Sequence, residues 1–85
     1  MLHVIEAKSA GAFRLNLRFS DGVEGVADLS SHLWGPVFEP LREQSAFARF
    51  RISPISGALE WDNGADLAPE ALENLVLLNP DQKAS

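Results

Sequence analysis

The chain of 85 residues contains no cysteine, which excludes disulfides, thiolate zinc sites and cysteine nucleophiles. It also lacks a long apolar run: the longest, residues 75–78, is far shorter than the roughly 18 residues that a membrane helix needs. The first residues show no charged region followed by an apolar stretch, so no secretory signal is visible. We therefore expect a cytoplasmic protein with no membrane partner.

The motifs of common enzyme classes are missing as well. No glycine-rich phosphate loop and no Gly-x-Ser-x-Gly elbow occurs, so neither nucleotide binding nor serine hydrolysis is indicated. His3 and His32 have no cysteine or histidine companions. Ser30 and Ser31 precede His32, but adjacent side chains do not preset a nucleophile–base hydrogen bond. We predict no catalytic, cofactor or metal site and no enzymatic activity.

Basic residues are scarce near the C-terminal end. The formal net charge is −5, and residues 52–85 carry six acidic side chains against Lys83 alone, which accounts for the whole excess. Because phosphate contacts dominate nucleic-acid affinity, we expect no direct binding of nucleic acid. An acidic surface serves solubility, and it also suits a basic protein partner.

What the sequence does contain is alternation of apolar and polar residues, which predicts antiparallel strands. Residues 13–19 alternate in this way, and residues 3–8 predict a short strand before them. A second hairpin is predicted from residues 49–52 and 59–61, with turn composition at residues 54–57 between them.

The first hairpin turns at Asp21 and Gly22, where two registers are possible. A two-residue loop would place Phe19 opposite Glu24. A three-residue loop, with Gly22 in the left-handed conformation, would place Glu24 opposite Arg18 instead. We prefer the three-residue loop, because it brings opposite charges together and a one-residue slip would exchange the two faces.

The segment between the hairpins has no clear period. Pro36 and Pro40 are too close together for one long helix. We predict a loop over residues 30–36 and short helical turns over residues 37–49, the last of them capped by Ser45. Three apolar side chains are expected to anchor this segment on the sheet, namely Phe38, Leu41 and Phe47.

The last third predicts a turn followed by a helix. Asn63 and Gly64 suit a turn with positive φ, and Pro69 suits the first turn of a helix that ends near residue 77. Ala68 would be a poor N-cap, so Asp66 is the better candidate for that role.

These elements together predict one α+β domain over residues 1–78. It consists of a small antiparallel sheet from two β-hairpins plus an N-terminal strand, irregular short helical turns and a short C-terminal helix. We expect residues 79–85 to form a frayed tail.

Asp62, Asn63 and Asp66 lie close together in sequence, as in a cation-binding loop. Their spacing lacks the alternating oxygen ligands and the bidentate glutamate of a calcium loop, and turn chemistry explains them without an ion. A metal-dependent hydrolase that uses Asp62, Asp66 or His32 is therefore only a further alternative.

Several segments carry a family resemblance. Residues 19–22 and 35–41, Phe47, Leu72 and the run Trp-Asp-Asn-Gly-Ala-Asp-Leu-Ala-Pro-Glu at residues 61–70 resemble a family of small bacterial proteins called domain of unknown function 2442. The resemblance spans about residues 3–76. Asp62 departs from the family pattern, where proline is expected.

The resemblance implies a small α+β fold and supplies no catalytic residues. Some family members look like fusions to a helix-turn-helix domain, and others resemble one partner of a toxin–antitoxin-like pair. Because this chain ends at Ser85, we expect no DNA-reading module in it.

Our functional prediction is a non-enzymatic module for protein–protein interaction or self-association, with a protein partner or a second copy, as in a dimer. Trp34 is the best interface anchor, because tryptophan is enriched at binding hot spots, although it could instead cover the small core. Glu60, Glu70 and Glu73 are the acidic interface candidates. The alternative is an antitoxin-like or transcription-linked accessory regulator that acts through a partner.

Overall fold

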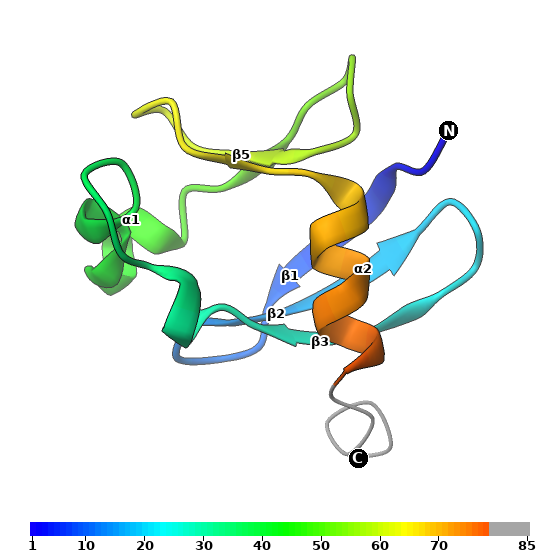
Figure 1. Ribbon diagram of the computed structural model, residues 1–85, viewed down its shortest axis with the longest axis horizontal. Helices are drawn as coiled ribbons and strands as arrows, with labels where there is room; N and C mark the ends of the chain where they lie inside the picture. Colours follow the sequence, from blue (N-terminus) through cyan, green and yellow to red (C-terminus); the bar gives the residue numbers. More distant parts are fainter. Residues whose placement is uncertain (79–85) are drawn as a thin grey trace.

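A computed structural model describes residues 1–78 of the chain, and the predicted frayed tail lies outside this range. Within it, two small antiparallel sheets and two α-helices surround one core (Figure 1). The first sheet contains, in spatial order, β1 (Val4–Ser9), β2 (Arg14–Phe19) and β3 (Glu24–Asp28). The second contains β4 (Arg51–Ile52), β5 (Leu59–Glu60) and β6 (Asp66–Leu67). The predicted α+β class is confirmed.

The turn between β2 and β3 adopts the preferred three-residue loop. Arg18 lies opposite Glu24 in the ladder, and Gly22 has a φ of 92°, a conformation that favours glycine. Oδ1 of Asp21 accepts a hydrogen bond from the backbone amide of Val23 at 3.1 Å. Asp21 and Gly22 therefore serve as the turn residues that the sequence predicts.

The charges on the first sheet pair differently from the expected ladder. The guanidinium of Arg18 lies 3.4 Å from the carboxylate of Glu6, its ladder neighbour on β1. Among residues 1–78, neither Arg18 with Glu24 nor Arg14 with Asp28 forms an ion pair within 4.0 Å. The position of Arg18 in the ladder therefore did not predict which of the two neighbouring carboxylates would pair with it.

The second predicted hairpin is present, but it belongs to a sheet of its own. β4 pairs with β5, and β5 pairs with β6 as well. The sequence did not predict β6, since two residues are too few to show a period. The segment between β4 and β5 is joined to the first sheet by a hydrogen bond of 2.9 Å from the Val4 amide to the Gly57 carbonyl.

The middle segment forms the short turns that its prolines predict. Between residues 37 and 49 these are the 3₁₀ helix η2 (Glu39–Arg42) and the helix α1 (Gln44–Phe47). Residues 30–36 were predicted as a loop, but they contain a further 3₁₀ helix, η1 (Ser30–His32). The prediction that Ser45 caps the last turn is wrong: Glu43 occupies the N-cap position. The hydroxyl of Ser45 lies within the helix and donates to Oε1 of Glu43 at 2.7 Å.

The C-terminal helix α2 (Pro69–Leu77) has the predicted bounds. The capping role expected for Asp66 is wrong, however. Asp66 lies in β6, and Ala68 is the N-cap, with no side-chain hydrogen bond to the helix. Pairing with β5 extends the backbone here, so the side chain of Asp66 does not satisfy the amides of the first turn.

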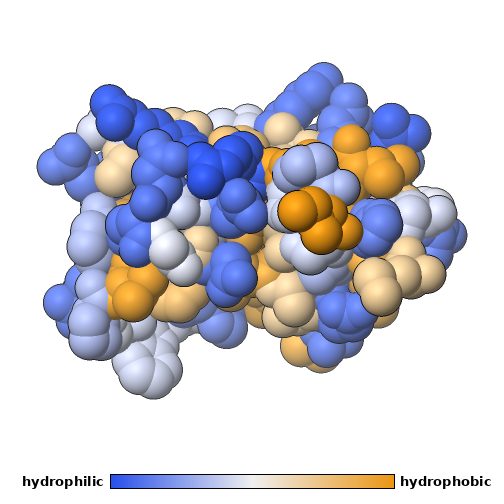
Figure 2. Space-filling view, turned by 90° about the horizontal axis from the view of Figure 1, so that it is seen from above, coloured by the Kyte–Doolittle hydropathy of each residue, from blue (hydrophilic) through white to orange (hydrophobic). Residues whose placement is uncertain are grey.

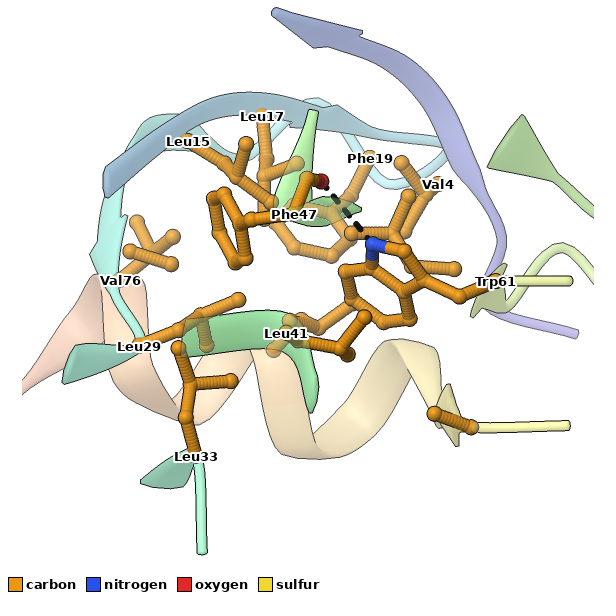
Figure 3. Close-up of a cluster of buried hydrophobic side chains, with 14 residues drawn as sticks. Val4, Leu15, Leu17, Phe19, Leu29, Leu33, Leu41, Phe47, Trp61 and Val76 are labelled. Atoms are coloured by element: carbon orange, nitrogen blue, oxygen red, sulfur yellow. Dashed lines mark hydrogen bonds between the residues drawn. The ribbon is translucent and has the colours of Figure 1, made fainter. Parts of the chain in front are cut away.

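Both sheets, the middle segment and α2 contribute to one hydrophobic core, and the predicted anchors Leu41 and Phe47 are buried in it (Figure 3). Phe38 is half-buried and packs against it. In the described range, no helix is long and apolar enough to cross a membrane. The buried cluster consists of Val4, Leu15, Leu17, Phe19, Ala27, Leu29, Leu33, Leu41, Phe47, Leu59, Trp61, Ala65, Leu72 and Val76.

Candidate protein-interaction surface

A shallow groove of about 250 Å³ runs between the middle segment and the turn after β5. Buried Leu41 and Trp61 contribute apolar walls, and exposed polar side chains form the rim. The residues that line the groove are Pro40, Leu41, Glu43, Ser45, Ala46, Arg49, Trp61, Asp62 and Asn63. Much of it therefore comes from two of the segments that carry the family resemblance, residues 35–41 and 61–70.

Trp61 fixes one wall of the groove. Its indole Nε1 donates a hydrogen bond of 2.9 Å to the backbone carbonyl of Phe47, drawn as the dashed line in Figure 3. The ring centroids of Phe47 and Trp61 are 5.9 Å apart, and Phe13 meets Phe47 edge to face at 5.3 Å. The buried indole N–H therefore has its partner, and both rings are packed against other aromatic side chains.

Asn63 connects the groove to the loop that carries Trp34. Its Oδ1 accepts from the Ala65 amide at 3.1 Å, while its Nδ2 donates to the Val37 carbonyl at 2.8 Å. Gly64 follows with a φ of 93°, so this pair forms the predicted turn. The bond to Val37 was not foreseen, because nothing local in the sequence indicates a partner so far along the chain.

Trp34 itself is 68% exposed, so it does not cover the core. Val37 in the same loop is 42% exposed. The loop is nevertheless held in place: Leu33 is buried beside Trp34, and Arg42 Nε donates to the Leu33 carbonyl. The carbonyl of Gly35 accepts hydrogen bonds from the backbone amides of Phe38 and Glu39. We refer to Trp34, Val37 and the groove together as the Trp34 surface.

The charges at the groove are partly paired. Arg51 contacts Asp62 and also Glu60, the latter at 3.0 Å, and these contacts, with Asp62 first, raise the pKa of Arg51. Glu60, one of the acidic interface candidates, is therefore already paired with a cation. Arg49 on the rim has no ion pair in the described part of the chain.

Glu70 and Glu73, the other acidic candidates, lie on α2 and do not line the groove. Glu73 instead faces Asp21, and both line a second, open hollow next to the N-terminal residues. Contact between the two carboxyl groups raises the pKa of Glu73 above 4.5 and lowers that of Asp21 below 3.8. Two carboxylates are both acceptors, so they need a shared proton to bond.

The residues considered for metal chemistry do not converge. Across residues 1–78, no group of three or more His, Cys, Asp or Glu side chains is placed to hold a metal ion. Asp62 is bound to Arg51, Asp66 is an exposed residue of β6, and His32 ends η1.

Pro69, which was expected to begin the C-terminal helix, is the first residue of α2.

Comparison with known proteins identifies the family. Neither a curated protein nor a solved structure matches the chain. A sequence model described as "Protein of unknown function (DUF2442)" matches residues 4–76, which is most of the chain. The chain therefore belongs to the DUF2442 family.

Proposed function

We propose that the protein is a non-enzymatic interaction module that binds another protein through the Trp34 surface. The observation that supports this proposal is a tryptophan that is 68% exposed in a loop held by hydrogen bonds. Tryptophan residues dominate the energetics of many interfaces, since their large rings lose much contact with water on binding. A loop that is already ordered loses little further conformational entropy when a partner docks.

The lining of the groove suits a protein partner. The groove has a volume of about 250 Å³. It is open, with apolar walls from Leu41 and Trp61 and with Arg49, a cation that has no ion pair among residues 1–78, on its rim. These features suit an apolar side chain of a partner, flanked by an acidic group.

A second candidate function is an antitoxin-like or transcription-linked accessory regulator in the bacterial cytoplasm. The uneven charge favours it, because the last third of the sequence carries the whole acidic excess. Such a surface attracts a basic protein, which could itself contact DNA. A small basic open reading frame beside the gene would favour this candidate, and tight duplex binding by the isolated chain would contradict it.

The test combines solution mass with capture of partners. Wild-type protein is expected to self-associate in sedimentation velocity runs or to retain a specific protein from the source cell. Trp34→Ala should weaken that association by about tenfold or more. Ile55→Ala is the matched control, because Ile55 is 88% exposed on the distant turn between β4 and β5, and it should leave binding unchanged.

Three outcomes would contradict the proposal. One is a strict monomer without any protein partner. Another is binding that Trp34→Ala leaves intact. The third is an equal loss in both variants, which would indicate general hydrophobic adhesion rather than a defined surface.

A further inference from the structure

The outer edge of β3 exposes backbone hydrogen-bonding groups. The amide of Phe19 donates to the Val23 carbonyl at 2.9 Å, and the amide of Leu29 donates to the Phe13 carbonyl at 2.8 Å. In an antiparallel pair, hydrogen-bonded residues alternate along the strand. The groups of the odd-numbered residues of this strand therefore face β2, and those of the even-numbered residues face away from it.

Three residues lie on this edge: Glu24, Val26 and Asp28. None of their backbone groups has a backbone partner from outside the first sheet in the described chain. α2 packs against β3 and buries Leu72 and Val76 in the core, but within residues 1–78 no backbone hydrogen bond joins α2 to this edge. An edge of this kind is a template for another strand.

The charge on the edge is acidic. Glu24 is exposed and has no ion pair within residues 1–78. Asp28 accepts from the Ser30 amide at 3.0 Å, and hydrogen bonds from Ser30 lower the pKa of Asp28 below 3.8. The adjacent strand β2 is basic at the facing positions, Arg14 and Arg18. The outer face thus changes from basic to acidic between neighbouring strands, and a basic strand would continue this alternation.

A second copy of the chain fits this edge poorly. The symmetric antiparallel register centred on Val26 pairs all three outward residues. It places Glu24 directly opposite Asp28 of the second copy, and it does so twice. Like charges directly opposite each other are destabilising. The two neighbouring symmetric registers place an acidic side chain opposite Val26 and gain no attraction.

We propose that the β3 edge binds an extended segment of a partner protein that carries lysine or arginine at alternate positions. Its backbone would pair with the free groups of the edge, and its cations would lie opposite Glu24 and Asp28. This inference rests on the proposed function in assuming a protein partner, but it concerns a surface separate from Trp34.

The probe is a capped peptide of sequence Thr-Lys-Thr-Val-Thr-Lys-Thr, compared with the same peptide carrying glutamate in place of lysine. Its palindromic order presents the same charges in either strand direction. In ¹⁵N–¹H correlation spectra, the lysine peptide should shift the amide signals of Glu24, Val26 and Asp28 and slow their hydrogen exchange. It should bind at least about tenfold more tightly than the glutamate peptide, and added salt should reduce the difference.

Matched variants separate the edge from general charge attraction. Glu24→Lys should weaken binding of the lysine peptide by several fold. Glu39→Lys makes the same charge change at an exposed residue of η2 and should weaken this binding less. Val26→Pro removes a donor at an edge position, where proline is tolerated, and should abolish the slowed exchange. Trp34→Ala should leave peptide binding unchanged, so a failure of the Trp34 proposal is distinguishable from a failure of this one.

The inference is overturned if both peptides bind equally, if the shifted signals map to another surface, or if Glu24→Lys and Glu39→Lys weaken binding to the same extent. It is also overturned if Val26→Pro disrupts a dimer of the free protein, because the edge would then belong to a second copy.

Discussion

At the scale of single residues, Asn63 shows how one side chain can shape a surface without chemistry of its own. It closes the local turn through Ala65 and reaches the Val37 carbonyl in the loop of Trp34. The turn role was predictable, because Asn-Gly favours positive φ whatever the rest of the chain does. The distant bond was not, since it depends on where folding places Val37.

The same distinction explains which residue roles failed. Asp21 and Gly22 behave as predicted, because a hairpin turn is decided by a few adjacent residues. Local turn chemistry was predicted for the group of Asp62, Asn63 and Asp66, but the carboxylate of Asp62 is bound by Arg51, whose ladder partner is Glu60. The fold brings the guanidinium of Arg51 to Asp62, and this ion pair takes the place of hydrogen bonds within the turn.

The Glu73–Asp21 pair gives a residue-scale prediction for pH. Since contact with Asp21 raises the pKa of Glu73 above 4.5, the folded state holds a proton there that the unfolded chain has released. This contribution to stability falls as pH rises from the unfolded-state pKa of Glu73 through its raised folded-state pKa. At neutral pH both carboxylates are charged and repel each other. Glu73→Gln should therefore raise the urea midpoint at about pH 7, with a smaller gain at about pH 4.

The control for this prediction is the Asp21→Asn background. Asparagine can still accept from the Val23 amide, but it no longer carries the charge. In this background Glu73→Gln should change the urea midpoint little at either pH. An equal gain in both backgrounds would show that the effect of Glu73 does not arise from Asp21.

At the scale of elements, α2 is the best predicted part of the fold and still has a weak start. Its apolar spacing and Pro69 gave both bounds, because helical period and proline act locally. β6 and the separation of the two sheets were not predictable in this way. Strands of two residues have no measurable period, and their pairing depends on the return of the chain after the Asn63-Gly64 turn.

The uncapped start of α2 leads to a stabilising substitution. Ala68 has the extended backbone of an N-cap, with φ of −65° and ψ of 148°, but no side-chain acceptor. Ala68→Ser should add a hydrogen bond to a free amide of the first turn and raise the free energy of unfolding by about 0.5–2 kcal/mol. Urea denaturation measures the change.

Ala71→Ser is the matched control, since Ala71 is exposed inside the same helix. There serine has no free amide to cap and should lower stability slightly, by about 0.5 kcal/mol. If the two substitutions change stability equally, the gain is not a capping effect.

At the scale of the whole molecule, the surface and the core have different characters. On the face that carries β5, Figure 2 shows hydrophobic side chains in several separate spots among polar ones. Scattered exposure of this kind is ordinary for a folded protein, so this face offers no large apolar interface. The core, by contrast, joins residues of both sheets and of α2 into one cluster.

That shared core predicts how the molecule unfolds. Trp61 from the second sheet bonds to the Phe47 carbonyl, and both residues belong to the cluster that contains Leu17 of β2 and Leu72 of α2. Neither sheet has enough buried surface to persist alone in so small a chain. We therefore expect a single cooperative transition in urea.

The two tryptophans make this expectation measurable. In a Trp34→Phe background, Trp61 is the only tryptophan, and its fluorescence reports on the second sheet. The intensity of the Leu17 amide signal reports on the first. The two urea midpoints should coincide, because losing either sheet exposes the core of the other. A lower midpoint for Trp61 would mean that the second sheet opens as an independent unit, and the groove that Trp61 lines would then belong to the least stable part of the molecule.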